Sequence, residues 1–227
     1  MRGKVLLLRR GTLLLILTAL VAAGIFMAVG GPSFVSASAA KRQLPIYSVE
    51  REEKVCAISF DAAWGNEDTQ ALIDILGKYN VKATFFVVGD WVDKYPESVK
   101  ALHDAGHEVM NHSLHHDHYN ALTADQVVAD VTACNEKIAA ITGVTPCLIR
   151  CPYGEYDDHV ISAIRSMGME PIQWDVDSLD WKDYDAGTIC KRVRDKLAPG
   201  SIVLFHNAAL HTPEALPSVL EHMIREG

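Results

Sequence analysis

Short apolar segments alternate regularly with helical segments along most of the chain. Segments typical of strands occupy residues 54–60, 82–88, 107–111, 146–150, 170–176 and 201–205. Amphipathic or helical patterns occupy residues 67–79, 97–105, 123–141, 158–167, 186–197 and 212–226. This alternation predicts parallel strands with helices packed outside them. The strand pattern is compatible with an open doubly wound sheet and with an incomplete β/α barrel, and periodicity does not separate the two.

Several of these segments carry signals for helix ends. Gly106 is placed to cap the helix that precedes it, and Thr123 and Gly143 flank the long helix on its two sides. Pro213 falls in the first turn of the last helix, where proline is tolerated. These signals set the expected helix boundaries.

Composition and charge exclude several classes of protein. The 227 residues are 49% hydrophobic and 22% charged, which is ordinary globular usage for one domain, or one domain plus a tail. Residues 1–39 hold four of the 21 basic residues and no acidic one, so the rest carries 17 basic against 29 acidic residues, a balance of −12. Such an acidic body is a poor match for a nucleic acid. No glycine-rich nucleotide loop is present either.

The amino-terminal segment predicts export. Arg2, Lys4, Arg9 and Arg10 precede an apolar run over residues 12–30, and a small-residue stretch follows at residues 36–40. These are the parts of a secretory signal, and the run is also long enough to anchor the chain in a membrane as one hydrophobic helix. We therefore divide the chain into a signal peptide or signal anchor (1–40), a linker or edge strand (41–53) and one domain (54–227).

Polar residues follow the predicted strands. They are Asp61, Trp64, His112, His116, Arg150, Tyr153, Asp180, Trp181 and His206. Each has an ordinary structural explanation: an aspartate at a strand end usually caps a turn, histidines can form a solvated loop, and an arginine before proline is usually a surface charge. The carboxyl ends of parallel strands share one face, however, so these residues are expected to converge on one site.

From about Lys54 to its end, the chain resembles the polysaccharide deacetylases of carbohydrate esterase family 4, the NodB homology domain. All five motifs of that family occur in order, including Phe60-Asp61, the H-S-x-x-H motif from His112 to His116, and Leu204-Phe205-His206. Residues 44–47 and 59–69 look most like the sporulation-associated, PdaB-like branch. The resemblance implies a distorted (β/α)7 barrel. The family usually continues into a last strand, so we expect a C-terminus shortened relative to that pattern.

The resemblance also implies catalytic roles. Asp61 matches the family's catalytic base and Arg150 the arginine that orients it. His206 matches the general acid and Asp180 the aspartate that tunes it. The chemistry agrees, because amide hydrolysis needs a group that accepts a proton from water and another that protonates the departing amine.

A divalent metal is implied as well, zinc or cobalt. His112 and His116 match its two histidine ligands, but the position of its carboxylate ligand, directly after the base, is Ala62. Alanine cannot bind a metal, so we expect a substitute ligand, with Asp68 favoured slightly over His115 and His118, or a site with reduced metal use.

Three residues match the substrate side of the family's site, and Trp64 joins them as an exposed aromatic candidate. The backbone N–H of Tyr153 is expected to help hold the oxyanion, and Trp181 to form an aromatic wall. Leu204 is expected to line the acetyl pocket, and Trp64 to stack on a sugar ring together with Tyr153 and Trp181.

These expectations combine into a metal-dependent N-deacetylase of cell-wall glycan, either peptidoglycan or a chitin-like polymer, which acts during spore formation. The protein is expected outside the cytoplasm, secreted or membrane-anchored, in the spore envelope or cell wall. A catalytically weak glycan-binding or spore-envelope protein is the alternative that Ala62 motivates. A hydrolase of small amides on the same fold is the third.

Overall fold

The computed structural model describes residues 11, 12, 14, 15, 17–21 and 42–226. The chain divides into two units, residues 1–41 and 42–227. In the first unit the described residues are helical, and the rest of the expected signal or anchor segment lies outside the described residues. Within the described part of the chain, no helix is both long and apolar enough to cross a membrane.

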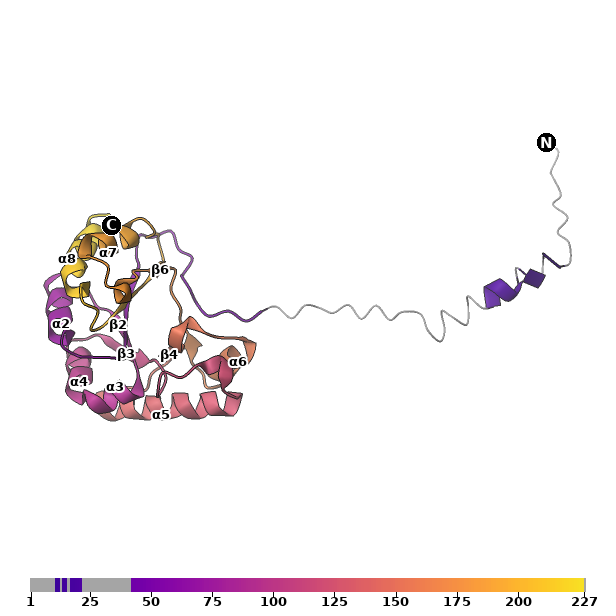
Figure 1. The fold of residues 1–227 in the computed structure, drawn as a ribbon, viewed down its shortest axis with the longest axis horizontal. Helices are drawn as coiled ribbons and strands as arrows, with labels where there is room; N and C mark the ends of the chain where they lie inside the picture. Colours follow the sequence, from indigo (N-terminus) through magenta and orange to yellow (C-terminus); the bar gives the residue numbers. More distant parts are fainter. Residues whose placement is uncertain (1–10, 13, 16, 22–41, 227) are drawn as a thin grey trace, which may run out of the picture. The chain divides into compact units, whose positions relative to one another are not determined.

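The second unit is built on one parallel sheet of seven strands (Figure 1). The strands are β1 Ala57–Ala62, β2 Thr84–Val87, β3 Glu108–Asn111, β4 Leu148–Ile149, β5 Glu170–Pro171, β6 Val176–Asp177 and β7 Ile202–His206. Their order is β5-β4-β3-β2-β1-β7-β6, with every paired strand parallel to its neighbour. The predicted parallel strands are therefore confirmed.

The sheet curls into an incomplete barrel. Its two end strands, β5 and β6, follow one another in the sequence, and only residues 172–175 separate them. We expected one strand over residues 170–176, and the structure corrects this to two strands at opposite ends of the sheet. The segment before β1 adds isolated β-bridges near the two end strands. Ile46 bridges to Ile172, and Ser48 bridges to Ser201. Of the two architectures that the strand pattern allowed, the structure therefore confirms the NodB-type barrel and not the open doubly wound sheet.

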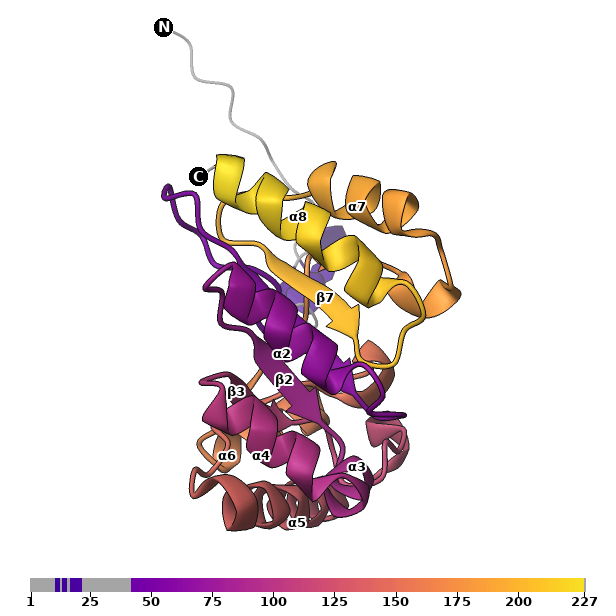
Figure 2. The same cartoon turned by 90° about the vertical axis from the view of Figure 1, so that its left-hand side faces the viewer.

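Helices cover the outside of the curled sheet. They are α2 Thr69–Lys78, α3 Gly89–Lys94, α4 Pro96–Asp104, α5 Ala124–Thr142, α6 Asp158–Ser166, α7 Ala186–Arg194 and α8 Thr212–Glu226. Figure 2 shows α2 and α8 side by side, with α4 on the other side of α2. The predicted caps of α5 are present: Thr123 forms a capping box with Gln126, and Gly143 is left-handed. Only α3 was missed, because it is short.

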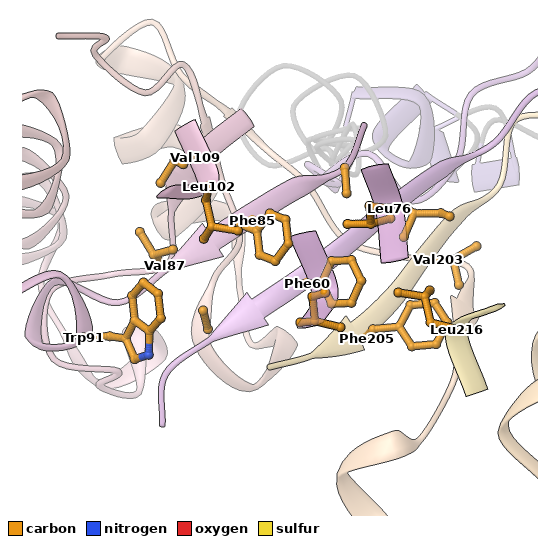
Figure 3. Packing of buried hydrophobic residues seen from close by; sticks show 14 of the residues in the cluster. Phe60, Leu76, Phe85, Val87, Trp91, Leu102, Val109, Val203, Phe205 and Leu216 are labelled. Atoms are coloured by element: carbon orange, nitrogen blue, oxygen red, sulfur yellow. The ribbon is translucent and has the colours of Figure 1, made fainter. Parts of the chain in front are cut away.

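The main core lies between the strands and these helices. Phe60 of β1 stacks on Phe85 of β2 and on Phe205 of β7, and Leu76 of α2 and Leu216 of α8 belong to the same core (Figure 3). Because side chains alternate along a strand, Ile58, Phe60 and Ala62 enter this core while Ser59 and Asp61 face the barrel interior. The pleat of β1 thus points Asp61 into the barrel.

Candidate active site

The predicted residues meet around one cavity of about 510 Å³. Its lining includes eight of them, together with Ala63, Gly154, Trp174 and Asp177; the eight are Asp61, Trp64, His112, His116, Tyr153, Trp181, Leu204 and His206. Arg150 and Asp180 lie behind this lining and are fully buried. The three candidates for a substitute metal ligand, Asp68, His115 and His118, do not line the cavity; Asp68 accepts the Ala208 N–H, and His115 and His118 contact Asp90 and Glu155.

Asp61 is paired with a buried cation. The Nη1 atom of Arg150 donates to its Oδ1 at 2.7 Å, and Arg150 has no exposed surface. Burial alone would raise the pKa of Asp61, but the charge of Arg150, followed by those of His112 and His206, more than offsets it and lowers that pKa. Asp61 is therefore a carboxylate at neutral pH and can accept a proton.

Residues that the sequence did not single out hold Arg150 in place. Its Nη2 atom donates to Ser59 Oγ at 2.9 Å and to the Gln173 carbonyl at 3.1 Å. The guanidinium also lies over the rings of Phe86, at 4.2 Å, and Trp174, at 5.5 Å. The two-residue period of β1 could have identified Ser59, because it shares a face with Asp61. Gln173 acts through its backbone, which leaves no sequence signal.

His206 is paired with a buried anion. Its Nδ1 atom lies 2.8 Å from Asp180 Oδ1, and Asp180 Oδ2 accepts the His206 backbone N–H at 2.7 Å. Thr212, which is buried and was not predicted, donates its hydroxyl to the same Oδ2 at 2.7 Å. Burial lowers the pKa of His206, but the hydrogen bond and charge of Asp180 outweigh it, so the pKa is raised. The imidazolium form therefore persists to higher pH than in a free histidine.

The two histidines of the H-S-x-x-H motif lie together, with ring centroids 5.0 Å apart. His112 Nδ1 lies 2.7 Å from the Arg150 carbonyl, an acceptor, which directs the Nε2 atom toward Asp61 Oδ2 at 3.6 Å. His116 Nδ1 is buried and has no hydrogen-bond partner among the residues that the structure describes. Burial lowers the pKa of both rings, for His116 to about 4, so both are neutral and able to act as ligands at neutral pH.

Helix α5 fixes the loop that carries these histidines. Asp130 Oδ1 accepts the Leu114 N–H at 2.8 Å and the Tyr119 hydroxyl at 2.6 Å. The loop itself is strained, since Ser113 (φ 74°) and His116 (φ 58°) are both left-handed. Non-glycine residues persist in that region only where their surroundings hold them, and such strain gathers at functional sites. No sequence pattern indicates this role of Asp130.

The complete ligand set of a metal site is not formed. Ala62 is buried in the core, and the described residues contain no group of three or more His, Cys, Asp or Glu side chains able to hold a metal ion. The substitutes considered from sequence contact other residues: Asp68 Oδ2 accepts the Ala208 N–H, His115 pairs with Asp90 and His118 with Glu155. The buried Oδ1 of Asp68 has no hydrogen-bond partner among the described residues. The histidine pair therefore fits a metal, and the described part of the chain places no third protein ligand beside it.

Aromatic side chains form the rim of the cavity. Trp64, Tyr153 and Trp181 are 65%, 56% and 55% exposed, so more than half of each side chain is accessible to a ligand. Tyr153 is also left-handed (φ 58°), and its ring stacks on His118 with centroids 4.2 Å apart. Leu204 is buried at the base of the cavity. The aromatic rim is suited to bind sugar rings, and the floor of the cavity at Leu204 is suited to bind a small apolar group.

Sequence comparison identifies relatives of this chain. The profile of the family described as "Polysaccharide deacetylase" matches residues 48–172. The peptidoglycan-N-acetylmuramic acid deacetylase PdaA of Bacillus subtilis is 31% identical over 189 residues, which cover 80% of this chain and 70% of PdaA. A peptidoglycan-N-acetylglucosamine deacetylase of Bacillus cereus is 33% identical over 151 residues, covering 66% of this chain and 55% of the relative.

Structure comparison adds a relative that bears on Ala62. A CE4 family pseudoenzyme from Bacillus anthracis superposes with a TM-score of 0.79 and 34% identity, over 81% of this chain and 65% of that chain. A mutant of that pseudoenzyme is described as having restored enzymatic activity; it superposes with a TM-score of 0.78 and 34% identity, over 81% of this chain and 67% of the mutant chain. The fold therefore accommodates both active and inactive sites.

Proposed function

The chain belongs to the polysaccharide deacetylase family of hydrolases, and from that premise we propose that it removes N-acetyl groups from amino sugars of cell-wall glycan. The observation that carries the proposal is the pair of charged contacts facing one cavity. Arg150 lies 2.7 Å from Asp61 and lowers its pKa, and Asp180 lies 2.8 Å from His206 and raises its pKa. Two titratable groups whose surroundings push their pKa values apart are suited to act as base and acid.

The proposed reaction uses these groups in turn. Asp61 accepts a proton from the water whose oxygen attacks the acetyl carbon. His206 protonates the amine nitrogen through Nε2 as the carbon–nitrogen bond breaks, since Asp180 occupies its Nδ1. The Tyr153 N–H stabilises the charge that develops on the acetyl oxygen, and Leu204 packs on the methyl group. The products are acetate and a free amino sugar.

A divalent metal, zinc or cobalt, is part of the proposal. Its ligands would be His112 and His116, and the buried, unpartnered Nδ1 of His116 supports a ligand there. When bound, such a metal supplies Lewis acidity and lowers the pKa of water. With Ala62 in place of a carboxylate, the affinity is expected to be weaker than that of a three-ligand site.

The substrate is proposed to be a polymer outside the cytoplasm. The exposed rings of Trp64, Tyr153 and Trp181 support stacking on successive sugars, and the two named relatives act on peptidoglycan. The basic and apolar residues 1–40 fit export or anchoring. The resemblance to the sporulation-associated branch motivates a role in the spore envelope or spore cell wall.

Ala62 favours a second candidate, a glycan-binding protein with little or no turnover. The similarity to a pseudoenzyme supports this reading, whereas the intact Asp61–Arg150 and Asp180–His206 contacts favour catalysis.

Mass spectrometry of muropeptides separates the two. Peptidoglycan incubated with the zinc-loaded chain is expected to lose acetyl groups, and the modified sugar identifies the substrate. The Asp61→Asn variant is expected to bind the polymer without modifying it. Unmodified muropeptides from a folded chain that still binds peptidoglycan would support the second candidate instead.

A further inference from the structure

Asp68 connects two loops on either side of the cavity. We propose that Asp68 is a positioning residue that fastens the loop after β7 to the loop after β1 and thereby sets the placement of His206 relative to Asp61. The inference rests on the proposed function, because it assigns a role within the same site. It replaces the role of metal ligand that the sequence suggested for this residue.

The side chain of Asp68 does not serve its own helix. Asp68 occupies the position before α2, where a carboxylate ordinarily accepts an N–H of the first turn, yet it makes no such bond. Its Oδ2 atom instead accepts the backbone N–H of Ala208 at 2.9 Å, 140 positions further along the chain. Ala208 lies two residues beyond His206.

Asn207 strengthens the same connection. Its side-chain amide donates to the Gly65 carbonyl, which also accepts the indole N–H of Trp91 at 2.9 Å. Its backbone N–H donates to the Asp61 carbonyl at 3.1 Å, and the residue is only 2% exposed. Two side chains, Asp68 and Asn207, therefore tie the loops together just beyond the strand ends that carry the base and the acid.

Backbone strain explains why this connection matters. Ala208 is left-handed (φ 54°), a conformation that a residue with a Cβ atom adopts only when its surroundings hold it. The bond from its N–H to Asp68 supplies that hold. Asp61 and His206 are direct partners in the β1–β7 register, so a relaxed turn at Ala208 would move the acid against the base.

The test uses the full chain with three variants at this position. Asp68→Ala removes the acceptor, Asp68→Ser keeps a helix N-cap but is too short to reach Ala208, and Asp68→Asn keeps an oxygen that can accept its N–H. Asp74→Ala, an exposed carboxylate on the same helix, is the matched control. Initial rates of acetate release from a peptidoglycan oligomer give kcat and KM, and calorimetry with zinc gives the metal affinity.

We expect Asp68→Ala and Asp68→Ser to lower kcat by about 10- to 100-fold, because a small displacement of reacting groups has effects of that size. KM and zinc affinity should stay near wild type, and Asp68→Asn should recover most of kcat. A loss of zinc affinity in Asp68→Ser would instead make Asp68 a ligand. Unchanged kcat in both Asp68→Ala and Asp68→Ser would overturn the proposal. The serine variant decides the question if the alanine variant does not fold.

The ring nitrogen resonances of His206 give a second readout that needs no turnover. They are expected to shift in Asp68→Ser and to remain unchanged in Asp74→Ala. If the wild-type chain releases no acetate, the proposed function fails, while these resonances still decide the role of Asp68. Resonances that are identical in Asp68→Ser and wild type would exclude it.

Discussion

At the scale of single residues, the site depends on two charged pairs that act in opposite directions. Arg150 lowers the pKa of Asp61, and Asp180 raises that of His206, against the effect of burial in each case. Asp61, the proposed base, therefore stays ionised to a lower pH than an ordinary aspartate, and His206, the proposed acid, keeps its proton to a higher pH than an ordinary histidine, whose pKa is about 6.5. The two shifts therefore widen the pH range in which an ionised Asp61 and a protonated His206 coexist.

This arrangement predicts the pH profile of kcat/KM. Activity rises as Asp61 ionises at acid pH and falls only as His206 loses its proton above pH 6.5. Asp180→Asn removes the charge that raises the His206 pKa, so the alkaline limb should move to lower pH and kcat should fall by about 10²-fold or more. An alkaline limb in the same place as in wild type would contradict the role of Asp180.

Ala62 leads to a second prediction at this scale. Ala62→Asp puts a carboxylate into a position that is 1% exposed and packed in the core, so the metal-free protein should lose several kcal/mol of stability. With zinc, the carboxylate gains a partner beside the histidines. Thermal unfolding with and without zinc should therefore show a larger zinc-dependent rise in Tm than wild type. A rise equal to that of wild type would mean that the carboxylate does not reach the metal.

At the scale of elements, α5 is the support of the histidine loop. Asp130→Ala removes the acceptor for Leu114 and Tyr119 and frees a loop with two left-handed residues. Zinc affinity, measured by calorimetry, should fall by about tenfold or more, as for other residues that orient metal ligands. Asp125→Ala, an exposed carboxylate in the first turn of α5, should leave the affinity unchanged. Equal zinc affinity in Asp130→Ala and Asp125→Ala would show that the histidine loop keeps its conformation without Asp130.

His107, directly before β3, makes the stability of the fold depend on pH. His107 is 4% exposed, its Nδ1 accepts the Ala83 N–H at 3.2 Å, and burial, followed by Lys82, lowers its pKa to about 4. The unfolded chain binds this proton near pH 6.5, so the contribution to stability is complete above that pH and is lost as pH falls toward 4. We expect the free energy of unfolding in urea to fall between pH 7 and pH 4 by about 2–3 kcal/mol less in His107→Gln than in wild type. An unchanged pH dependence would contradict a neutral His107.

Some boundaries of helices and strands can be predicted from the sequence, and others cannot. Helix ends with chemical signals, such as Thr123 and Gly143 around α5, can be predicted closely because each cap satisfies local hydrogen bonds. The division of residues 170–176 into β5 and β6 cannot, because it depends on how the distant ends of the sheet meet. The same holds for Asp68, whose partner Ala208 is set by the pairing of β1 with β7.

At the scale of the whole molecule, the convergence of the site follows from topology. Parallel strands bring their carboxyl ends to one edge, so residues as distant as Asp61, His116, Arg150 and His206 could be assigned to one site from the sequence. The residues that support them, Ser59, Asp130 and Thr212, could not, because their contacts cross between elements. Strand position predicts which polar residues share the site, the family resemblance supplies the roles expected of them, and tertiary packing decides which residues hold them.

The most direct test of the proposed activity is acetate release from peptidoglycan by residues 42–227, which form a compact unit of their own. The protein is loaded with zinc or cobalt, assayed, treated with a chelator and assayed again, with Asp61→Asn in parallel. We predict release that depends on the metal, returns when the metal is restored, and is absent in Asp61→Asn. No release from folded, metal-loaded protein, or equal release by Asp61→Asn, would contradict the account.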